Sequence, residues 1–197
     1  MTSIKMNARF LAGLATLSFA IATSNAAEVA GVKLDDKVRI GSQELVLNGA
    51  GVRTRAFFKV YVGGLYLAEK KSTPAEVLAL KGAKRVSMIL LRDLSAEQIA
   101  EALGDGIRNN HTATEMEALK PRVDELLAVI KMIGEAKTGN AITLDFLPES
   151  GTRVSLNGVA KGNAVAGEDF YRALLRIWLG DKPVDSDLKK AMLGAAH

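Results

Sequence analysis

The chain has 197 residues, with 26 Lys and Arg against 22 Asp and Glu, and it contains no cysteine. The absence of cysteine excludes disulfides, thiolate nucleophiles and cysteine-based metal sites. The formal net charge of +4 is too small to indicate a nucleic-acid partner.

The first 26 residues are typical of a secretory signal peptide. Lys5 and Arg9 precede an apolar run over residues 10–22, and Ser24-Asn25-Ala26 offers small residues for cleavage. We expect cleavage after Ala26 or one residue later, with no stable transmembrane segment remaining; an uncleaved anchor is the alternative. Residues 27–197 are then expected to form one domain in the bacterial periplasm, since a core of this size needs no disulfides.

The residues after the signal peptide predict strands. Apolar and polar residues alternate between residues 29 and 47, with turn residues at 35–36 and 41–42, so we expect two short edge strands. Gly49 and Gly51 then indicate a tight turn or a close backbone approach, with Arg53 at the root of the next strand.

A long aromatic strand is predicted from Ala56 to Glu69. The Gly63-Gly64 pair within this strand favours a bulge or a close backbone approach. Strict alternation places three residues on one face, Phe57, Lys59 and Tyr61, and three on the other, Phe58, Val60 and Val62.

Two helices are predicted by capping boxes. Thr73-Pro74-Ala75-Glu76 marks the start of a short helix that ends near Lys81-Gly82. Ser95-Ala96-Glu97-Gln98 starts a longer helix with an apolar stripe. Residues 85–91, between the two helices, are nearly all apolar and predict a central strand covered on both faces.

The second half of the chain predicts a hairpin between helices. Residues 115–130 keep helical apolar spacing, and Pro121 is expected to kink or restart that helix. Alternating residues at 142–146 and 154–159 predict a hairpin, after which Asn157-Gly158 either ends the second arm or leads to a third strand. An amphipathic helix over 167–179 and a short helix after Asp185 follow. This order favours an α+β fold in which helices pack on one face of a large antiparallel sheet.

Few residues are candidates for metal binding or catalysis. His111 lies in a polar loop and His197 ends the chain, so both are expected to be exposed and unengaged, and no metal site is predicted. The sequence has neither a Gly-x-Ser-x-Gly elbow nor a Gly-rich nucleotide-binding pattern, and no cofactor is expected. Arg85 and Arg92-Asp93 are expected at solvated strand ends or in exposed ion pairs.

Arg53 and Tyr61 are the candidates for a binding site. The guanidinium offers a fixed fork of donors that suits a carboxylate, and the phenol adds another donor beside apolar side chains. Such a pair suits the head of an amphiphilic acid. Taken alone, however, arginine and tyrosine are more often structural: Arg53 would bond the carbonyls of its own glycine turn, and Tyr61 would fill the core.

Several segments resemble the chalcone isomerase-like family, including its bacterial secreted branch. The resemblance is carried by Gly-Ala-Gly-Val-Arg53 and by Phe58-Lys59-Val60-Tyr61-Val62-Gly63-Gly64-Leu65-Tyr66-Leu67. Later segments are also similar: Arg92-Asp93-Leu94-Ser95, Trp178-Leu179-Gly180 and Pro183-Val184-Asp185-Ser186-Asp187-Leu188-Lys189. The resemblance implies an open-faced β-sandwich, in which helices cover a large antiparallel sheet and a ligand cleft lies between them.

The resemblance also bears on activity. In the plant enzymes, the arginine that matches Arg53 helps to activate the phenol that attacks an enone. Their strand threonine is replaced here by Tyr61, their helical tyrosine has no counterpart between Asn109 and Ile133, and their late threonine falls at Ile177. An arginine with a strand tyrosine is similar to the fatty-acid-binding members instead.

We therefore predict a non-catalytic, monomeric periplasmic protein that binds a fatty acid or a similar amphiphilic carboxylate through Arg53 and Tyr61. Its apolar tail is expected to lie against helices that carry Met116, Leu127, Met132 and Trp178. One alternative is an isomerase or intramolecular lyase for a chalcone-like or other small conjugated substrate, with Arg53 stabilising charge and Tyr61 as acid or base. Another is a structural or partner-binding role, with the cleft filled by the protein's own side chains.

Overall fold

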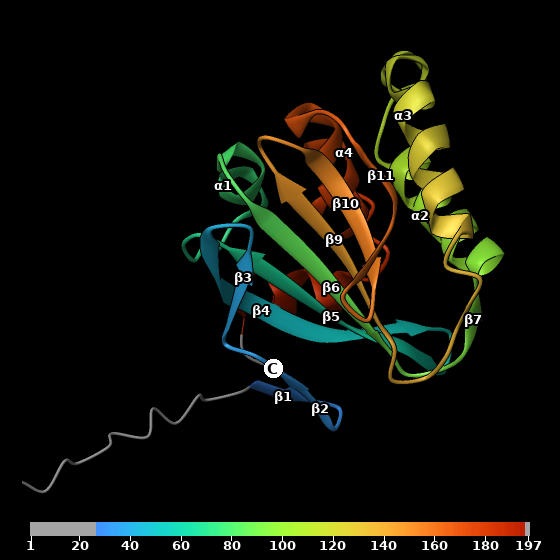
Figure 1. The fold of residues 1–197 in the computed structure, drawn as a ribbon. Coiled ribbons are helices and arrows are strands. Elements are labelled where there is room, and N and C mark those ends of the chain that lie inside the picture. The colour runs from blue at the N-terminus through green and yellow to red at the C-terminus, as the bar shows by residue number, and fades with distance from the viewer. Residues whose placement is uncertain (1–26, 196–197) are drawn as a thin grey trace, which may run out of the picture.

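The fold is built around a seven-stranded antiparallel sheet, in a computed structural model that describes residues 27–195 (Figure 1). The strands of this sheet are β3 (Lys37–Ile40), β4 (Gln43–Arg55), β5 (Phe58–Leu67), β6 (Lys84–Leu90), β9 (Ala141–Leu147), β10 (Gly151–Leu156) and β11 (Val159–Val165). Two short pairs are β1 (Ala27–Val29) with β2 (Val32–Leu34), and β7 (Leu94–Ser95) with β8 (Glu135–Ala136). The helices are α1 (Pro74–Ala79), α2 (Ala96–Asn109), α3 (Ala113–Lys131), α4 (Glu168–Leu179) and α5 (Ser186–Met192).

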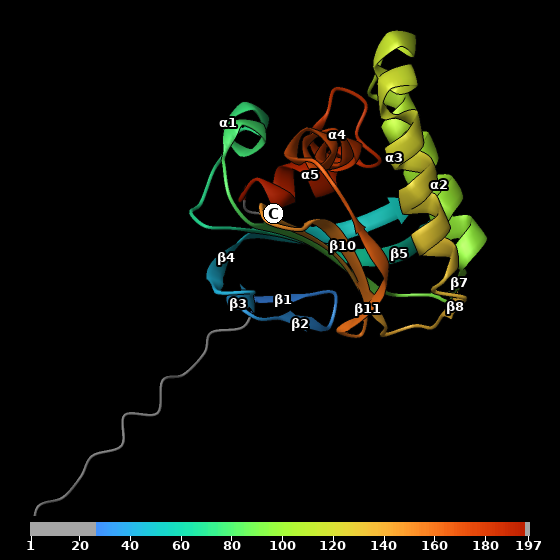
Figure 2. The ribbon, with the colours of Figure 1, turned by 45° about the horizontal axis from the view of Figure 1, so that its top comes forward.

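The strand order in the large sheet is β11-β10-β9-β6-β5-β4-β3. β6 is therefore central, as its apolar sequence predicts. The helices lie on one side of the sheet and the β1–β2 hairpin on the other (Figure 2). The predicted α+β architecture, a large antiparallel sheet with helices on one face, is confirmed. The expected signal peptide and His197 lie outside the described residues.

Two hydrophobic clusters occupy the two faces of the sheet. The larger cluster lies under the helices and includes the fully buried Trp178, Phe146 and Phe170. The smaller cluster includes Leu34 and Tyr66, and the β1–β2 hairpin contributes to it. Fully burying a side chain of this kind stabilises the fold by about 1.5–3 kcal/mol, so the larger cluster dominates stability and holds α2 and α4 against the sheet.

The helix starts follow the predicted capping chemistry. Thr73 with Glu76 caps α1, and Ser95 with Gln98 caps α2, each pair exchanging two hydrogen bonds. A third capping box, Thr112 with Glu115, starts α3 and was not predicted. Pro121 lies inside α3, which is a single helix, so the expected restart at this proline is wrong.

Of the two roles predicted for the glycines at 49 and 51, the tight turn is wrong and the close backbone approach is confirmed at Gly49. β4 runs without a break from Gln43 to Arg55, and the chain turns at Ala56, whose φ is +54°. Gly49 is needed for a close approach instead, because a Cβ there would clash with the carbonyl oxygen of Ala191 at the end of α5. Leu45 and Leu47, which were predicted to end the short edge strands, therefore belong to the long strand β4.

The second predicted hairpin is confirmed and continues into a third strand. β9 and β10 pair with the expected alternation, and residues 157 and 158 form the turn that leads into β11. Asn157 and Gly158 both have positive φ, +51° and +79°. The alternative in which this dipeptide only ends the second arm is therefore wrong.

Candidate functional site

A cavity of about 410 Å³ lies between the sheet and the helices α2 and α4. This volume is within the range of about 300–1,000 Å³ that is typical of small-molecule sites. The lining residues are Arg53, Arg55, Ala56, Phe58, Val60, Tyr61, Met88, Leu90, Arg92, Leu94, Gln98, Ile99, Glu101, Ala102, Leu103, Asp105, Ile142, Ile177, Trp178 and Val184. The cleft is thus open space, which the protein's own side chains do not fill.

The lining divides into an apolar wall and a charged margin. The wall is made of buried residues from β5, β6, β9, α2 and α4: Val60, Met88, Leu90, Ile99, Leu103, Ile142 and Ile177. The margin carries three arginines, at positions 53, 55 and 92, and two acidic residues of α2, Glu101 and Asp105. Such a cavity suits a ligand with an apolar body and an anionic head.

A β-bulge decides which side chains of β5 reach the cavity. Arg53 pairs with Tyr61, but the next pair is Thr54 with Lys59, so Val60 is an extra residue in β5. Beyond the bulge, the alternation is reset and Phe58 lines the cavity together with Tyr61. The predicted face shared by Phe57, Lys59 and Tyr61 is therefore wrong, because strict alternation takes no account of the extra residue.

Tyr61 presents a neutral hydroxyl inside the cavity. Its side chain is buried, and its oxygen accepts a hydrogen bond of 2.8 Å from Nε1 of Trp178. Burial raises the pKa of Tyr61 to about 12, although the nearby Arg53 charge and the Trp178 hydrogen bond act in the opposite direction. Among the described residues, no acceptor takes the hydroxyl proton, so the phenol retains a donor for a ligand.

Arg53 lies directly across the strand pair from Tyr61. Its guanidinium carbon is 5.7 Å from the centre of the Tyr61 ring, and its Nε is buried without a hydrogen-bond partner. Asp185 is engaged elsewhere, since one carboxylate oxygen caps α5 and the other accepts a hydrogen bond from the Thr54 amide. Within residues 27–195, no carboxylate forms an ion pair with Arg53. The expected alternative, in which Arg53 bonds its own glycine turn, fails because that turn does not exist.

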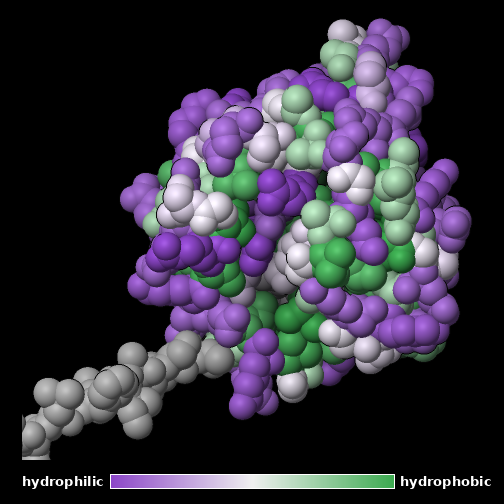
Figure 3. Space-filling model, in the orientation of Figure 1, coloured by the Kyte–Doolittle hydropathy of each residue, from purple (hydrophilic) through white to green (hydrophobic). Residues whose placement is uncertain are grey.

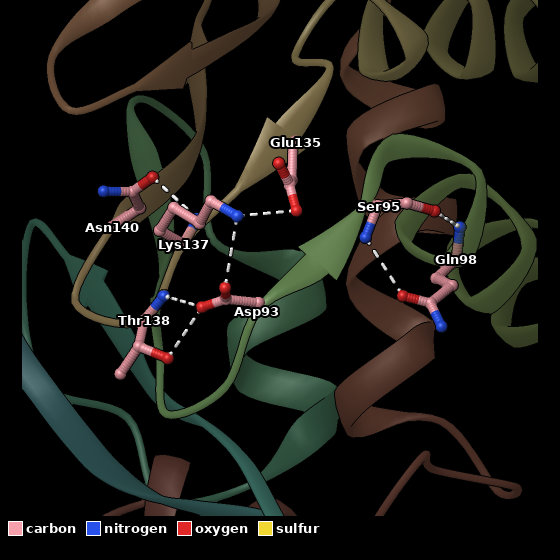
Figure 4. A network of polar contacts seen from close by, with 7 residues as sticks. All are labelled: Asp93, Ser95, Gln98, Glu135, Lys137, Thr138 and Asn140. Carbon is pink, nitrogen blue, oxygen red and sulfur yellow. Dashed lines mark hydrogen bonds and ion pairs between the residues drawn. The ribbon is translucent and has the colours of Figure 1, made fainter.

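A polar network around Asp93 fixes the segment between β6 and β7, which also carries Arg92 (Figure 4). Asp93 accepts hydrogen bonds from the amide and hydroxyl of Thr138, at 2.8 and 3.0 Å, and pairs with Lys137 at 3.3 Å. Lys137 also pairs with Glu135 at 2.6 Å. The pKa of the Asp93 carboxyl is lowered, first by the hydrogen bond from the Thr138 amide. The predicted exposed ion pair therefore involves Asp93 and Lys137, while Arg92 lies over the Phe58 ring.

The structure shows which of the residues named for the predicted helices line the cavity. Of these four residues, only Trp178 does so. Met132 is 63% exposed, and Met116 and Leu127 pack against the core from outside the lining. From α2, Ile99 and Leu103 of the predicted apolar stripe contribute to the wall.

Two further expectations about polar residues change. Nδ1 of His111 lies 2.7 Å from the carbonyl oxygen of Ile107 at the end of α2, so this histidine is engaged. Arg85 forms a two-pronged, partly buried ion pair with Asp145, with both contacts at 2.6 Å, rather than ending a strand in solvent. The described part of the chain contains no group of three or more His, Cys, Asp or Glu that could hold a metal ion.

A second cavity, of about 450 Å³, lies on the opposite face of the sheet, which is turned towards the reader in Figures 1 and 3. The Arg85–Asp145 pair, Ser87, Thr143 and Arg153 contribute to its lining. Hydrophilic side chains prevail on this face of the molecule (Figure 3). Leu34, Ile40 and Leu147 also line this second cavity, so both cavities have apolar residues. The buried Arg53 Nε without a partner belongs to the cavity beneath the helices, which is therefore the better candidate for an amphiphile with an anionic head.

Comparison with known proteins agrees with the fold. The chain is similar to the crystal structure of an Arabidopsis thaliana fatty-acid binding protein, AtFAP1, with a TM-score of 0.61 and 15% sequence identity over 83% of this chain and 92% of that one. No curated protein matches the sequence. No helix within residues 27–195 has the length and hydropathy required to span a membrane. The family model described as chalcone isomerase-like matches residues 26–194. This match covers most of the sequence, and the chain belongs to the chalcone isomerase-like family.

Proposed function

We propose that the protein binds a fatty acid or a similar amphiphilic carboxylate in the cavity beneath the helices, with Arg53 and Tyr61 at its head group. The observation that carries this proposal is the pair of unused donors at an apolar wall. The Arg53 Nε is buried without a partner, and the Tyr61 hydroxyl has no protein acceptor among the described residues.

The chemistry of the two donors suits a carboxylate. The guanidinium supplies charge-assisted hydrogen bonds, and the phenol donates another. A phenol is neutral at pH 7, and burial, which raises the pKa of Tyr61 to about 12, keeps it so at higher pH. A bound carboxylate would satisfy donors that are costly to leave buried and unpaired. The apolar wall of residues such as Met88, Leu90 and Leu103 would then cover the alkyl chain. The name of the fold neighbour AtFAP1, a fatty-acid binding protein, supports the same class of ligand.

The alternative activity, isomerisation or lysis of a conjugated substrate, has less support in the site. A phenol with a pKa of about 12 serves poorly as a general base near neutral pH, because almost none of it is present as phenolate. Location in the periplasm is part of the proposal and rests on the sequence of residues 1–26.

The test compares an acid with an uncharged analogue of the same length. Delipidated protein is titrated calorimetrically with lauric acid and with lauryl alcohol. Hydrogen bonds to charged groups contribute about 1.5–3 kcal/mol, so Arg53→Gln is expected to weaken lauric acid binding by about 10–100-fold and alcohol binding much less. The matched control is Arg39→Gln, which removes an exposed arginine from β3, away from this cavity.

Two results would reject the proposal. One is the absence of both co-purified lipid in native mass spectrometry and any shift in melting temperature with added fatty acids. The other is an equal loss of acid binding in Arg53→Gln and in the Arg39→Gln control. Turnover of a chalcone panel that disappears in Arg53→Gln would favour the isomerase alternative instead.

A further inference from the structure

The turn between β4 and β5 exposes two large aromatic side chains. Phe57 is 97% exposed and Phe58 is 62% exposed, although phenylalanine is among the residues most often buried. They are adjacent in sequence at the end of a long hairpin, which lies at the same end of the molecule as β7 in Figures 1 and 2. Neighbouring exposed aromatic residues of this kind mark an interaction surface.

The same turn is cationic. Residues 52–60 contain Arg53, Arg55 and Lys59 but no acidic residue, and Arg92 from the next loop lies 5.3 Å from the centre of the Phe58 ring. Among the described residues, none of these four cations forms an ion pair. The opposite margin of the cavity, on α2, carries Glu101 and Asp105, of which Asp105 is paired with Arg108. The positive charge at the cavity margin is thus concentrated beside Phe57 and Phe58.

The turn also forms part of the cavity margin. The cavity lining includes Arg55, Ala56 and Phe58 of the turn, and Arg92 of the next loop. Phe57 is not part of the lining. A surface that covers the turn would therefore adjoin the cavity.

We propose that the β4–β5 turn docks onto a lipid membrane that contains anionic phospholipids. Phe57 and Phe58 enter the boundary between head groups and acyl chains, and Arg55, Lys59 and Arg92 contact the lipid phosphates. Exposed aromatic residues flanked by cations satisfy both parts of such an interface at once. Docking in this orientation places the cavity margin at the membrane, where an amphiphile exchanges without crossing water. The docking itself goes beyond the proposed ligand and does not require it.

Vesicle co-sedimentation of the delipidated protein, without added fatty acid, tests the docking. Vesicles of phosphatidylcholine with phosphatidylglycerol are compared with vesicles of phosphatidylcholine alone. We expect binding to the anionic vesicles that weakens with added salt, and a loss of about tenfold or more in Phe57→Ser, since a buried phenylalanine accounts for about that factor. Lys59→Gln is expected to lose about fivefold, as for one cation near an anionic surface.

The control is Val159→Ser, which removes another exposed hydrophobic residue, 62% exposed, from β11. It is expected to leave vesicle binding unchanged. Phe57→Trp supplies a second measurement that does not depend on affinity: its fluorescence should shift to the blue with anionic vesicles and be quenched by brominated lipids. Phe57 makes no core contact that these substitutions could disrupt, because it is almost fully exposed.

Docking is overturned if the wild-type protein does not sediment with an excess of anionic vesicles, or if Phe57→Ser and Val159→Ser bind equally. A concentration-dependent dimer that Phe57→Ser abolishes, without vesicle binding, would also overturn it and assign the turn to a second copy of the chain. Fatty-acid titration in the absence of vesicles is independent of all these results, so a failure of docking and a failure of the proposed ligand are distinguishable.

Discussion

Replacing Tyr61 by phenylalanine tests two roles of its hydroxyl group: its effect on the stability of the fold and its effect on the binding of a carboxylate. The change deletes one oxygen atom and keeps the ring that packs under α4. It leaves the indole Nε1–H of Trp178, 1% exposed, without its acceptor at 2.8 Å. The variant therefore tests both the hydrogen bond and the donor that we assign to the ligand.

The expected loss of stability follows from that unpaired donor. Leaving a buried donor unsatisfied costs about 1–3 kcal/mol. For a domain of this size, about 1 kcal/mol lowers the melting temperature by about 2–4 °C. Urea unfolding of the ligand-free protein should thus show a reduced unfolding free energy, with an unchanged slope against urea concentration.

The expected loss of binding has a different cause. Without the hydroxyl proton, the ligand carboxylate loses one of the two donors assigned to it, and lauric acid should bind about tenfold or more weakly, while lauryl alcohol changes less. Trp178→Phe is the matched variant, because it breaks the same hydrogen bond but leaves the Tyr61 hydroxyl free to donate. It should be destabilised and still prefer the acid over the alcohol.

The refuting result is specific. If Tyr61→Phe keeps the wild-type preference for acid over alcohol, the hydroxyl does not contact the carboxylate, whatever happens to stability. If Tyr61→Phe and Trp178→Phe lose that preference equally, the hydrogen bond acts by positioning the ring. Either outcome would remove Tyr61 from the proposed head-group site.

Two further predictions concern the scaffold and its ionisation. Gly49→Ala should lower the unfolding free energy by about 3 kcal/mol or more in urea, because its Cβ clashes with backbone at the end of α5, whereas Gly134→Ala, which meets no atom within 4 Å, should lose about 1 kcal/mol through its positive φ of 72° alone. All three tyrosines have raised pKa values, first because of burial, with Tyr61 and Tyr66 at about 12, so near-ultraviolet absorbance should show no phenol ionising near pH 10 until the protein unfolds. The phenols of the unfolded chain ionise near pH 10, so the contribution of these groups to the unfolding free energy is fully present below pH 10 and is lost as the pH rises towards 12. Ionisation of a phenol at pH 10 in the folded protein would contradict the burial of these hydroxyls.

Local signals predicted much of the fold because their partners are near in sequence. The boxes at Thr73 and Ser95 each need only a residue three positions later. The same pattern is present at Thr112 and Glu115, where polar composition alone had suggested a turn. The turn at Ala56 carries no glycine or asparagine signal, because an alanine adopts the positive φ there. Gly49 resembled a turn residue since its neighbour, α5, is formed by residues about 140 positions later.

The site could be predicted only in part for the same reason. Arg53 and Tyr61 were predicted as a pair, and the structure places both at one cavity, opposite each other in adjacent strands. Their ligand role stays a prediction. The contribution of Trp178 Nε1 depends on α4 crossing β5, and the position of Phe58 depends on the extra residue at Val60; neither has a local pattern.

The bulge at Val60 has a consequence for how this chain can diverge. Side chains of a strand change face with each residue, so the extra residue separates the register of the turn from that of the sheet. Insertions or deletions beyond it leave Arg53 opposite Tyr61 as long as the bulge is kept. The tip of the hairpin can therefore change in length and composition, and with it the exposed surface and the part of the cavity margin that it forms, while Arg53 and Tyr61 keep their positions.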